Sequence, residues 1–496
     1  FETVSTEHFR ISYMYNCGYL VEKVSKKLEQ LYSIYKDTYG LTLPSKTDVL
    51  ILDSDYSNGW ALPYTNTITL WTHDLDFELR GTHDWWDDVI AHEYAHIVSI
   101  ISGLKLSPAI PDIRFGFFSH PNEKDRIEAF QSLSTSILPF WLTEGIAQYE
   151  SSRHGADSWD SHRDMILRTL SLSDKLHSWA HMQVGAGKSD DYEKSYNHGF
   201  ALVSYIAEKY GYDKVVQMVR ESTKINRLDF DRVIKIVLGI SSEQLYEEWK
   251  NDLLKKYRQK ITDIGTQVYG KKINKDGFVN LWPKFSPDGS RIYFLSNGKN
   301  DYSRKNLYSY ALSDTVEEKQ KIRLEMGIAN IYDIHAPSGK ISYSSAHSAK
   351  SQLPARMGGS KVLDLFTDTL PPDKKTFRLF HKTDKQLTRK KSVFSLSFSP
   401  SGDRIAYAHR SVDRFFLSIT DTSGQFDKKI FPGKSDSIEI RYIFSLDWAP
   451  NGKDIAFSFM DKKNRKIAIY DTTDNSCKVL CSSEFDQRDP CFSPDG

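Results

Sequence analysis

The pattern of hydrophobic and polar positions divides the chain into two parts of different character. In the first part, apolar residues recur at helical spacing over residues 19–39, 84–103, 140–149 and 246–260. Strand-like stretches accompany them at residues 6–14, 47–53 and 66–72. After about residue 270, short alternating strands separated by turn residues replace this pattern. We therefore predict a multidomain protein, with an α+β domain over residues 1–265 and an all-β domain over residues 266–496.

One helix of the first part carries signals at both of its ends. Asp84 can cap its N-terminus, and Asp87 and Asp88 suit a first turn, where the helix dipole favours negative charge. Gly103 is a stop signal. Between these ends, apolar residues repeat at helical spacing at Trp86, Val89, Ile90, Ile97 and Val98. We predict a helix between Asp84 and Gly103.

The second part repeats a turn. A ten-residue segment that begins at Phe285 recurs at Phe398 and Trp448, with a degenerate copy at Ala336 and the start of another at Phe492. The proline of this motif stands at positions 287, 337, 400, 450 and 494, which are 50, 63, 50 and 44 residues apart. That period is typical of β-propeller blades. Proline presets the turn and glycine supplies its positive φ, so the motif predicts structure rather than catalysis.

Composition narrows the classes of function. The 496 residues carry a net charge of +1, so no whole-chain field attracts nucleic acid or an anionic membrane, and we expect no nucleic-acid partner. No run approaches the ~18 apolar residues of a membrane span. Four cysteines are too few for a disulfide framework. Cys477 and Cys481 either pair across a turn or remain free thiols.

The predicted helix carries the strongest chemical signal, the sequence His92-Glu93-Tyr94-Ala95-His96, which reads H-E-x-x-H. Residues four apart share a helix face, so His92 and His96 can direct two imidazoles at one metal ion. Glu93 is rotated by about 100° from His92, beside the metal, where it can take a proton from a metal-bound water. A catalytic zinc needs three protein ligands and an open position, and two histidines with one glutamate are a known set. Glu144, 48 residues after His96, is our candidate for the third ligand.

The segment around Glu144 reads W-L-T-E-G-I-A-Q-Y from Trp141 to Tyr149, in a second helix-like stretch. Together with H-E-x-x-H it resembles the gluzincin metallopeptidases, the group that contains thermolysin and aminopeptidase N. The resemblance covers roughly residues 1–262. It implies one zinc ion held by His92, His96 and Glu144, with Glu93 as the general base.

The same resemblance suggests further site residues. The segment Asn58-Gly59-Trp60-Ala61 is similar to the substrate-binding edge strand of that group. Gluzincins usually place a tyrosine or histidine near the developing oxyanion, and Tyr196 is our candidate, with His198 as the runner-up.

Two departures from the family pattern bear on the reaction. Gln148 stands where thermolysin-type enzymes carry an aspartate, four residues after the third ligand. Aminopeptidase N-type enzymes carry a G-x-M-E-N motif whose glutamate holds the substrate amine, and residues 59–63 contain no glutamate. The sequence therefore favours an endopeptidase over an aminopeptidase.

The turn repeats resemble the blades of TolB-type propellers. Four units and the start of a fifth are present, so we expect a propeller that is incomplete at Gly496. It would bind substrate, gate access or dock a protein partner. The TolB-like resemblance suggests an exported, periplasmic or extracellular protein, and a first residue that is Phe1 rather than methionine agrees with a removed leader.

Three functions remain open from the sequence. The first is a zinc endopeptidase that acts on peptides or proteins. The second is a non-catalytic binding protein, in which the propeller is an interaction module and the peptidase domain is spent. The third places the chemistry after Gly496, because similar propellers occur in the prolyl oligopeptidase group of serine hydrolases; the chain itself contains no G-x-S-x-G.

Overall fold

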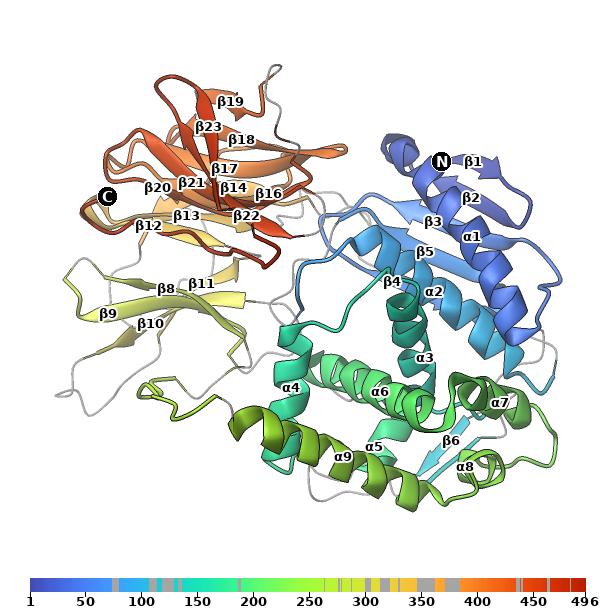
Figure 1. The fold of residues 1–496 in the computed structure, drawn as a ribbon. Coiled ribbons are helices and arrows are strands. Elements are labelled where there is room, and N and C mark those ends of the chain that lie inside the picture. Colours follow the sequence, from blue (N-terminus) through green and yellow to red (C-terminus); the bar gives the residue numbers. More distant parts are fainter. Residues whose placement is uncertain are drawn as a thin grey trace. The chain divides into compact units, whose positions relative to one another are not determined.

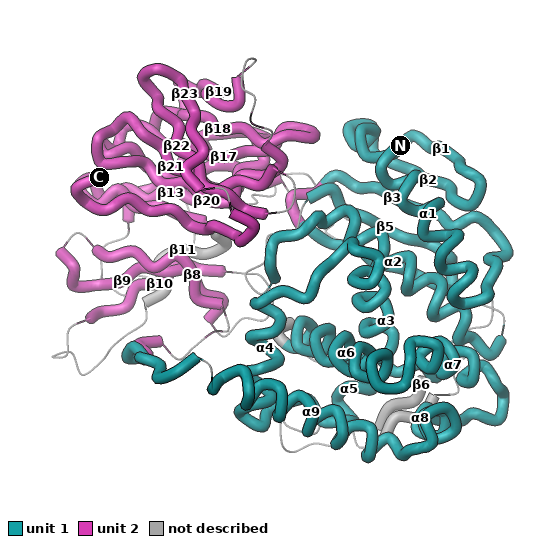
Figure 2. The backbone as a smooth tube through the Cα atoms, in the orientation of Figure 1, with its two compact units in different colours: residues 1–53, 57–271 teal, residues 54–56, 272–496 magenta. Residues whose placement is uncertain are grey.

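The structure is a computed structural model of the whole chain, and its described residues form two compact units (Figures 1 and 2). Unit 1 comprises residues 1–53 and 57–271, and unit 2 comprises residues 54–56 and 272–496. The residues that the structure describes are 1–73, 80–106, 114–117, 129–132, 136–185, 189–262, 264–274, 277, 279–286, 288–298, 305–312, 322–328, 331–345, 362–370, 384–433, 438, 440–461, 464–481 and 483–496.

Unit 1 is mainly helical and contains one five-stranded sheet. Its strands are β1 (Glu2–Ser5), β2 (Phe9–Tyr13), β3 (Thr47–Leu52), β4 (Gly59–Leu62) and β5 (Thr67–Trp71), with a separate pair of β6 (Arg114–Phe117) and β7 (Ala129–Ser132). Its α-helices are α1 (Val21–Tyr39), α2 (Trp85–Ser102), α3 (Phe140–Arg153), α4 (Ser161–Leu172), α5 (Trp179–Val184), α6 (Ser189–Tyr210), α7 (Tyr212–Ser222), α8 (Phe230–Leu238) and α9 (Ser242–Thr262). Two 3₁₀ turns are η1 (Tyr15–Leu20) and η2 (Pro63–Thr65).

The sheet has the strand order β1-β2-β3-β5-β4. β2, β3 and β5 are parallel, whereas β1 and β4 run antiparallel to their neighbours. Alternate side chains of the central strands are fully buried and share one core with α1 and α2, as Ile11, Val49 and Leu70 show. On the opposite face, Arg10 and Asp48 form an ion pair across β2 and β3 and are partly exposed. One face of the sheet therefore packs against α2. β4 is the edge strand of the sheet, next to β5.

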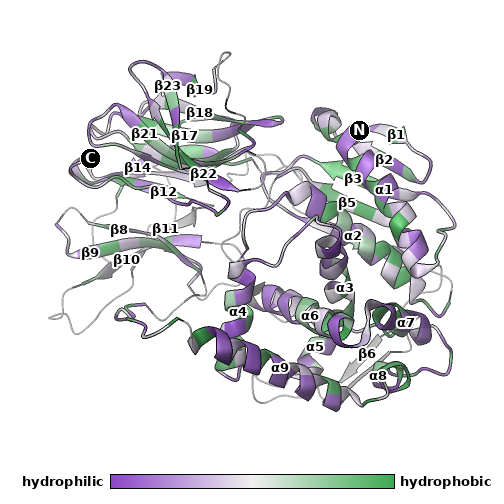
Figure 3. Ribbon diagram, in the orientation of Figure 1, coloured by the Kyte–Doolittle hydropathy of each residue, from purple (hydrophilic) through white to green (hydrophobic). Residues whose placement is uncertain are grey.

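Two helices that come after the sheet in the chain, α3 and α6, are in close contact. A Cβ on Gly145 of α3 would lie 2.3 Å from the carbonyl oxygen of Gly199 of α6, and one on Gly199 would lie 2.5 Å from the carbonyl oxygen of Trp141. The two backbones thus meet directly, because neither position carries a side chain. Farther along, α9 turns Leu245, Trp249, Leu253 and Tyr257 into the core, while much of its remaining surface is hydrophilic (Figure 3).

The described residues of unit 2 form four consecutive four-stranded antiparallel sheets, a β-propeller-like arrangement of four blades. The strands of the first two are β8 (Asn280–Phe285), β9 (Arg291–Ser296), β10 (Lys305–Ala311), β11 (Ile322–Ile328), β12 (Tyr332–His335), β13 (Lys340–Ser345), β14 (Asp364–Thr369) and β15 (Lys385–Gln386), with the 3₁₀ turn η3 (Ala336–Ser338). Those of the last two are β16 (Val393–Phe398), β17 (Arg404–Ser411), β18 (Arg414–Asp421), β19 (Asp427–Phe431), β20 (Tyr442–Trp448), β21 (Asp454–Met460), β22 (Arg465–Asp471) and β23 (Ser476–Cys481).

The predicted turn motif joins the first two strands of every blade. Its glycine has a positive φ in each copy, and the glycine N–H donates to the carbonyl oxygen three residues earlier, as in the pairs Gly289–Ser286, Gly339–Ala336, Gly402–Ser399 and Gly452–Ala449. This confirms the motif as a structural turn, although Pro287 itself lies outside the described residues.

Cys477 and Cys481 both lie on β23 and form no disulfide with each other. Four steps along an extended strand separate them by about 13 Å, too far for a disulfide. Pairing across a turn, the alternative left open by the sequence, is therefore wrong. Among the helices that the structure describes, none combines the length and the apolar content that a bilayer-spanning segment needs.

Candidate metal centre

Helix α2 presents His92 and His96 from one of its faces. The Asp84 side chain accepts hydrogen bonds from the backbone N–H groups of Trp86 and Asp87, at 3.1 and 3.3 Å, and the helix ends at Gly103. Both predicted ends are confirmed. Because the two histidines are four residues apart, their rings stand one turn above the other, with centroids 4.8 Å apart.

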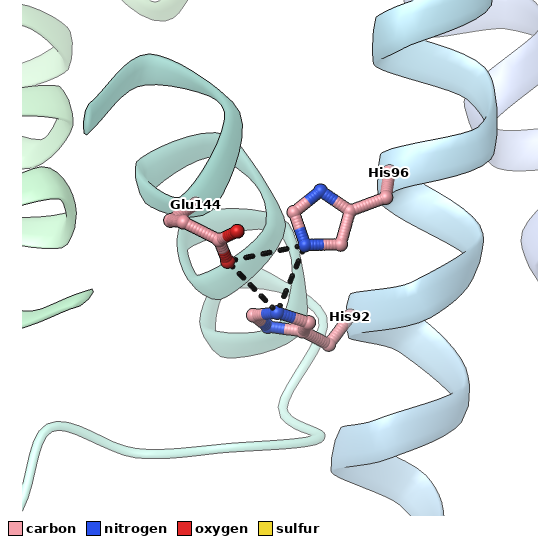
Figure 4. A group of neighbouring side chains, drawn as sticks. All are labelled: His92, His96 and Glu144. Carbon is pink, nitrogen blue, oxygen red and sulfur yellow. Dashed lines mark hydrogen bonds and ion pairs between the residues drawn. The ribbon is translucent and has the colours of Figure 1, made fainter. Parts of the chain in front are cut away.

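Helix α3 brings Glu144 against this histidine pair (Figure 4). The Nε2 atoms of His92 and His96 are 3.1 Å apart, and Glu144 Oε2 lies 3.5 Å from the first and 3.2 Å from the second. Three ligand atoms of a tetrahedral zinc site, each about 2.0–2.1 Å from the metal, are separated by about 3.3–3.4 Å. The triangle formed by these three atoms therefore has the size that a zinc ion requires.

The polarity of the three atoms also fits a cation. Glu144 Oε2 is buried and receives no hydrogen bond from the described residues. Although burial alone would raise it, the charges of His96 and His92 bring the pKa of Glu144 to about 2, so the carboxylate is anionic. A buried carboxylate oxygen beside two imidazole nitrogens requires a positive charge, which either protonated histidines or a metal ion supplies, and a metal ion would satisfy all three atoms at once.

Glu93 lies beside this triangle, on the side of the sheet edge. A Cβ on Gly59 of β4 would lie 3.0 Å from Glu93 Oε1 and 2.5 Å from a methyl carbon of Val89, so only glycine lets the strand pass this close to the carboxylate. Burial raises the pKa of Glu93, while His92 and His96 oppose the rise. A carboxylate in this position suits a general base.

The segment from Asn58 to Ala61 forms most of the sheet's terminal strand. Asn58 precedes β4, and its carbonyl oxygen accepts a hydrogen bond from the backbone N–H of Trp71 at 3.1 Å. Gly59 and Ala61 alternate with Trp60, whose side chain is half exposed and whose ring centroid lies 5.8 Å from that of Trp71. The sheet therefore presents a strand edge next to Glu93.

The structure separates the two candidates for an oxyanion donor. The ring centroid of Tyr196, on α6, lies 6.3 Å from that of His92. The charge of Glu144, followed by burial, raises the pKa of Tyr196, so its phenol keeps its proton. His198, by contrast, is fully buried; its Nε2 accepts from the N–H of His177 at 3.1 Å, and its Nδ1 donates to the carbonyl oxygen of Lys194 at 2.5 Å. The geometry favours Tyr196.

The histidine group around His198 predicts acid sensitivity. Burial lowers the pKa of His198 to about 4 and that of His177 to about 2, below the ordinary value of about 6.5 for an unfolded chain. The unfolded state therefore binds more protons than the folded state below pH 6.5, and this contribution to stability, present above pH 6.5, is lost as the pH falls toward 4.

We expect each of these two histidines to lower the free energy of unfolding by about 2 kcal/mol at pH 5 relative to pH 7.5. Thermal unfolding of wild type and His198→Gln, followed between these pH values, measures the effect. The stability gap between the two proteins should shrink as the pH falls. A gap that stays constant with pH would show that the pKa of His198 is the same in the folded and unfolded states, which contradicts the prediction.

Other charged residues near the site were not predicted. Arg80 donates from Nε to Glu193 at 3.0 Å, and its guanidinium lies 5.8 Å from the ring centroid of Tyr196. Asp88 is buried on α2, one turn before His92. Arg80 and Glu193 are 113 residues apart, so their pairing leaves no local signal in the sequence.

Comparison with known proteins does not identify a family. No family model and no curated protein sequence matches the chain. Among solved structures, a putative TolB from Agrobacterium tumefaciens is 15% identical with a TM-score of 0.33, over 44% of this chain and 67% of that one. TolB from Acinetobacter baumannii is 18% identical with a TM-score of 0.31, over 41% and 43% of the two chains. A puromycin-hydrolyzing peptidase from Mycobacterium tuberculosis is 10% identical with a TM-score of 0.30, over 42% and 30%.

Proposed function

We propose that this chain is a zinc-dependent peptidase that hydrolyses bonds within peptide or protein chains. The observation that carries the proposal is the triangle of His92 Nε2, His96 Nε2 and Glu144 Oε2, with edges of 3.1, 3.2 and 3.5 Å and Glu93 beside it. The ligand set of two imidazoles and one carboxylate suits zinc among the available divalent ions.

The residues around the triangle divide the work of hydrolysis. Bound zinc would lower the pKa of a water molecule toward about 7 and polarise the scissile carbonyl. Glu93 takes the proton of the attacking water and returns it to the leaving amine. The Tyr196 phenol, which keeps its proton, donates a hydrogen bond to the developing oxyanion. Each role belongs to a side chain that the fold holds within one cluster.

The edge of β4 suits an extended peptide. A strand at the end of a sheet offers backbone N–H and C=O groups to an added strand, and Gly59 lets β4 itself lie close to Glu93. The strand, from Gly59 to Leu62, contains no carboxylate that could hold a free N-terminal amine. The absence of a carboxylate on this strand favours cleavage inside a peptide chain.

The proposal has two further parts. The protein is exported, and the propeller binds substrate, gates access to the site or docks a protein partner.

The test compares cleavage of matched peptides with a blocked and a free N-terminus. We expect the purified protein to cut both forms at internal bonds with similar efficiency, because recognition uses the peptide backbone. Release of single N-terminal residues from the free form alone would show an aminopeptidase and contradict the endopeptidase proposal. Cleavage of neither form would favour the non-catalytic binding protein.

A further inference from the structure

A buried carboxylate links the two helices that supply the proposed metal ligands. Asp88 is only 2% exposed and lies four residues before His92, on the same face of α2. Ser151 is fully buried on α3, seven residues after Glu144, which is two helical turns along the same face. The Ser151 hydroxyl donates to Asp88 Oδ1 at 2.6 Å. One hydrogen bond thus joins the His92 face of α2 to the Glu144 face of α3.

The charge of Asp88 is maintained by its other neighbours. Its Oδ2 lies 3.1 Å from His83 Nε2, and His83 Nδ1 lies 3.0 Å from the carbonyl oxygen of Gly81. Burial alone would lower the pKa of His83, but Asp88 raises it above the ordinary value, so the pair favours a charged imidazole beside an anionic carboxylate. Against its own burial, His83 and then His92 hold the pKa of Asp88 well below its usual range.

On α3, the residue one helical turn after Glu144 is not a carboxylate. Gln148, four residues after Glu144, donates from Nε2 to Asp157. Asp157 also accepts from both terminal nitrogens of Arg163, at 2.7 and 2.8 Å. Asp88 is therefore the buried carboxylate that stands next to a proposed ligand along the helix face.

We propose that Asp88 is a positioning residue of the metal centre: through its hydrogen bond with Ser151 it fixes the spacing between α2, which carries His92, and α3, which carries Glu144. The inference rests on the proposed function only in taking zinc to bind at His92, His96 and Glu144. Groups behind metal-ligating histidines commonly set ring orientation and ligand basicity, and their loss typically weakens metal binding by about 10–100-fold.

A second metal ion at this place is disfavoured. His83, Asp88 and Asp157 do converge closely enough to hold one. However, Arg163 already pairs with both oxygens of Asp157, and Arg80, whose side chain is 12% exposed, adds a second positive charge that acts on Asp88. A cation bound there would face two guanidinium groups, so the cluster acts as a support for the neighbouring site.

The test measures zinc affinity by competition with a chromogenic chelator for wild type, Asp88→Asn and Ser151→Ala. Asp87→Asn is the matched control, because Asp87 is the adjacent carboxylate on α2, is about one third exposed and pairs with Lys23. We expect Asp88→Asn to weaken zinc binding by about 10–100-fold, Ser151→Ala to weaken it less and Asp87→Asn to leave it unchanged. Thermal unfolding of the metal-free proteins is measured alongside.

A role limited to holding the fold would lower the melting temperature of metal-free Asp88→Asn and leave its zinc affinity unchanged, which would overturn the proposal. If Asp88→Asn fails to fold, Ser151→Ala decides, and unchanged zinc affinity in that variant overturns the proposal. Wild type that binds no zinc overturns both this inference and the proposed function. Wild type that binds zinc but cuts no peptide overturns the peptidase function, while the zinc affinities still decide the role of Asp88.

Discussion

Replacing Glu93 with glutamine is expected to lower the rate of peptide cleavage by about 10²–10⁴-fold, because the variant keeps the shape of the side chain but cannot accept a proton. His92 and His96 are untouched by the change, and the triangle of ligand atoms does not include Glu93. We therefore expect the variant to retain zinc. Initial rates on a blocked peptide, with zinc content measured on the same sample, check the prediction.

The pairing of these two measurements separates the role of Glu93 from that of a ligand. Loss of zinc together with activity would assign Glu93 to the metal and not to proton transfer. Cleavage that stays within twofold of the wild-type rate would show that the reaction does not use this carboxylate. The general base would then have to be a residue other than Glu93.

Replacing Gly145 with alanine is expected to lower the midpoint of thermal unfolding by about 2–10 °C, as overpacking of a tight interior does. The added Cβ would lie 2.3 Å from the carbonyl oxygen of Gly199 and 2.6 Å from Val203 Cγ2, so backbone must move. Separation of α3 from α6 would also draw Tyr196 away from Glu144. Cleavage should accordingly fall in the fraction of protein that remains folded.

Gly18→Ala is the matched control for this substitution. A Cβ at Gly18 would meet Tyr13 Cε2 at 3.5 Å, which is an ordinary contact. The control should unfold within about 1–2 °C of wild type and cut peptides at the same rate. A Gly145→Ala protein as stable and active as this control would show that the close contact of α3 and α6 does not place the site.

Local signals explain which parts of the fold the sequence predicts. The cap at Asp84, the stop at Gly103 and the apolar repeat between them are properties of adjacent residues, and α2 forms where they indicate. The strands predicted at residues 47–53 and 66–72 are β3, whose alternate side chains are buried, and β5, whose three central residues are buried. β1 escapes prediction because all four of its residues are exposed, which leaves no hydrophobic alternation.

Long-range contacts explain what the sequence leaves open. His92 and His96 are set by one helix, but the distance to Glu144 depends on how α2 and α3 pack. The choice between Tyr196 and His198 depends on the meeting of Gly145 and Gly199, which lie in different helices. The link from Asp88 to Ser151 spans 63 residues and involves residue types that are common on helix surfaces. None of these contacts is marked by a periodic pattern of hydrophobic residues in the sequence.

The most direct test of the central claim is the zinc content of the purified protein, measured for wild type and for Glu144→Gln after dialysis against a weak chelator. If His92, His96 and Glu144 form a metal centre, wild type retains one zinc per chain and Glu144→Gln loses most of it, since an amide oxygen is a poorer zinc ligand than a carboxylate. Wild type without bound zinc, or equal zinc in both proteins, would contradict the metal centre and with it the proposed peptidase.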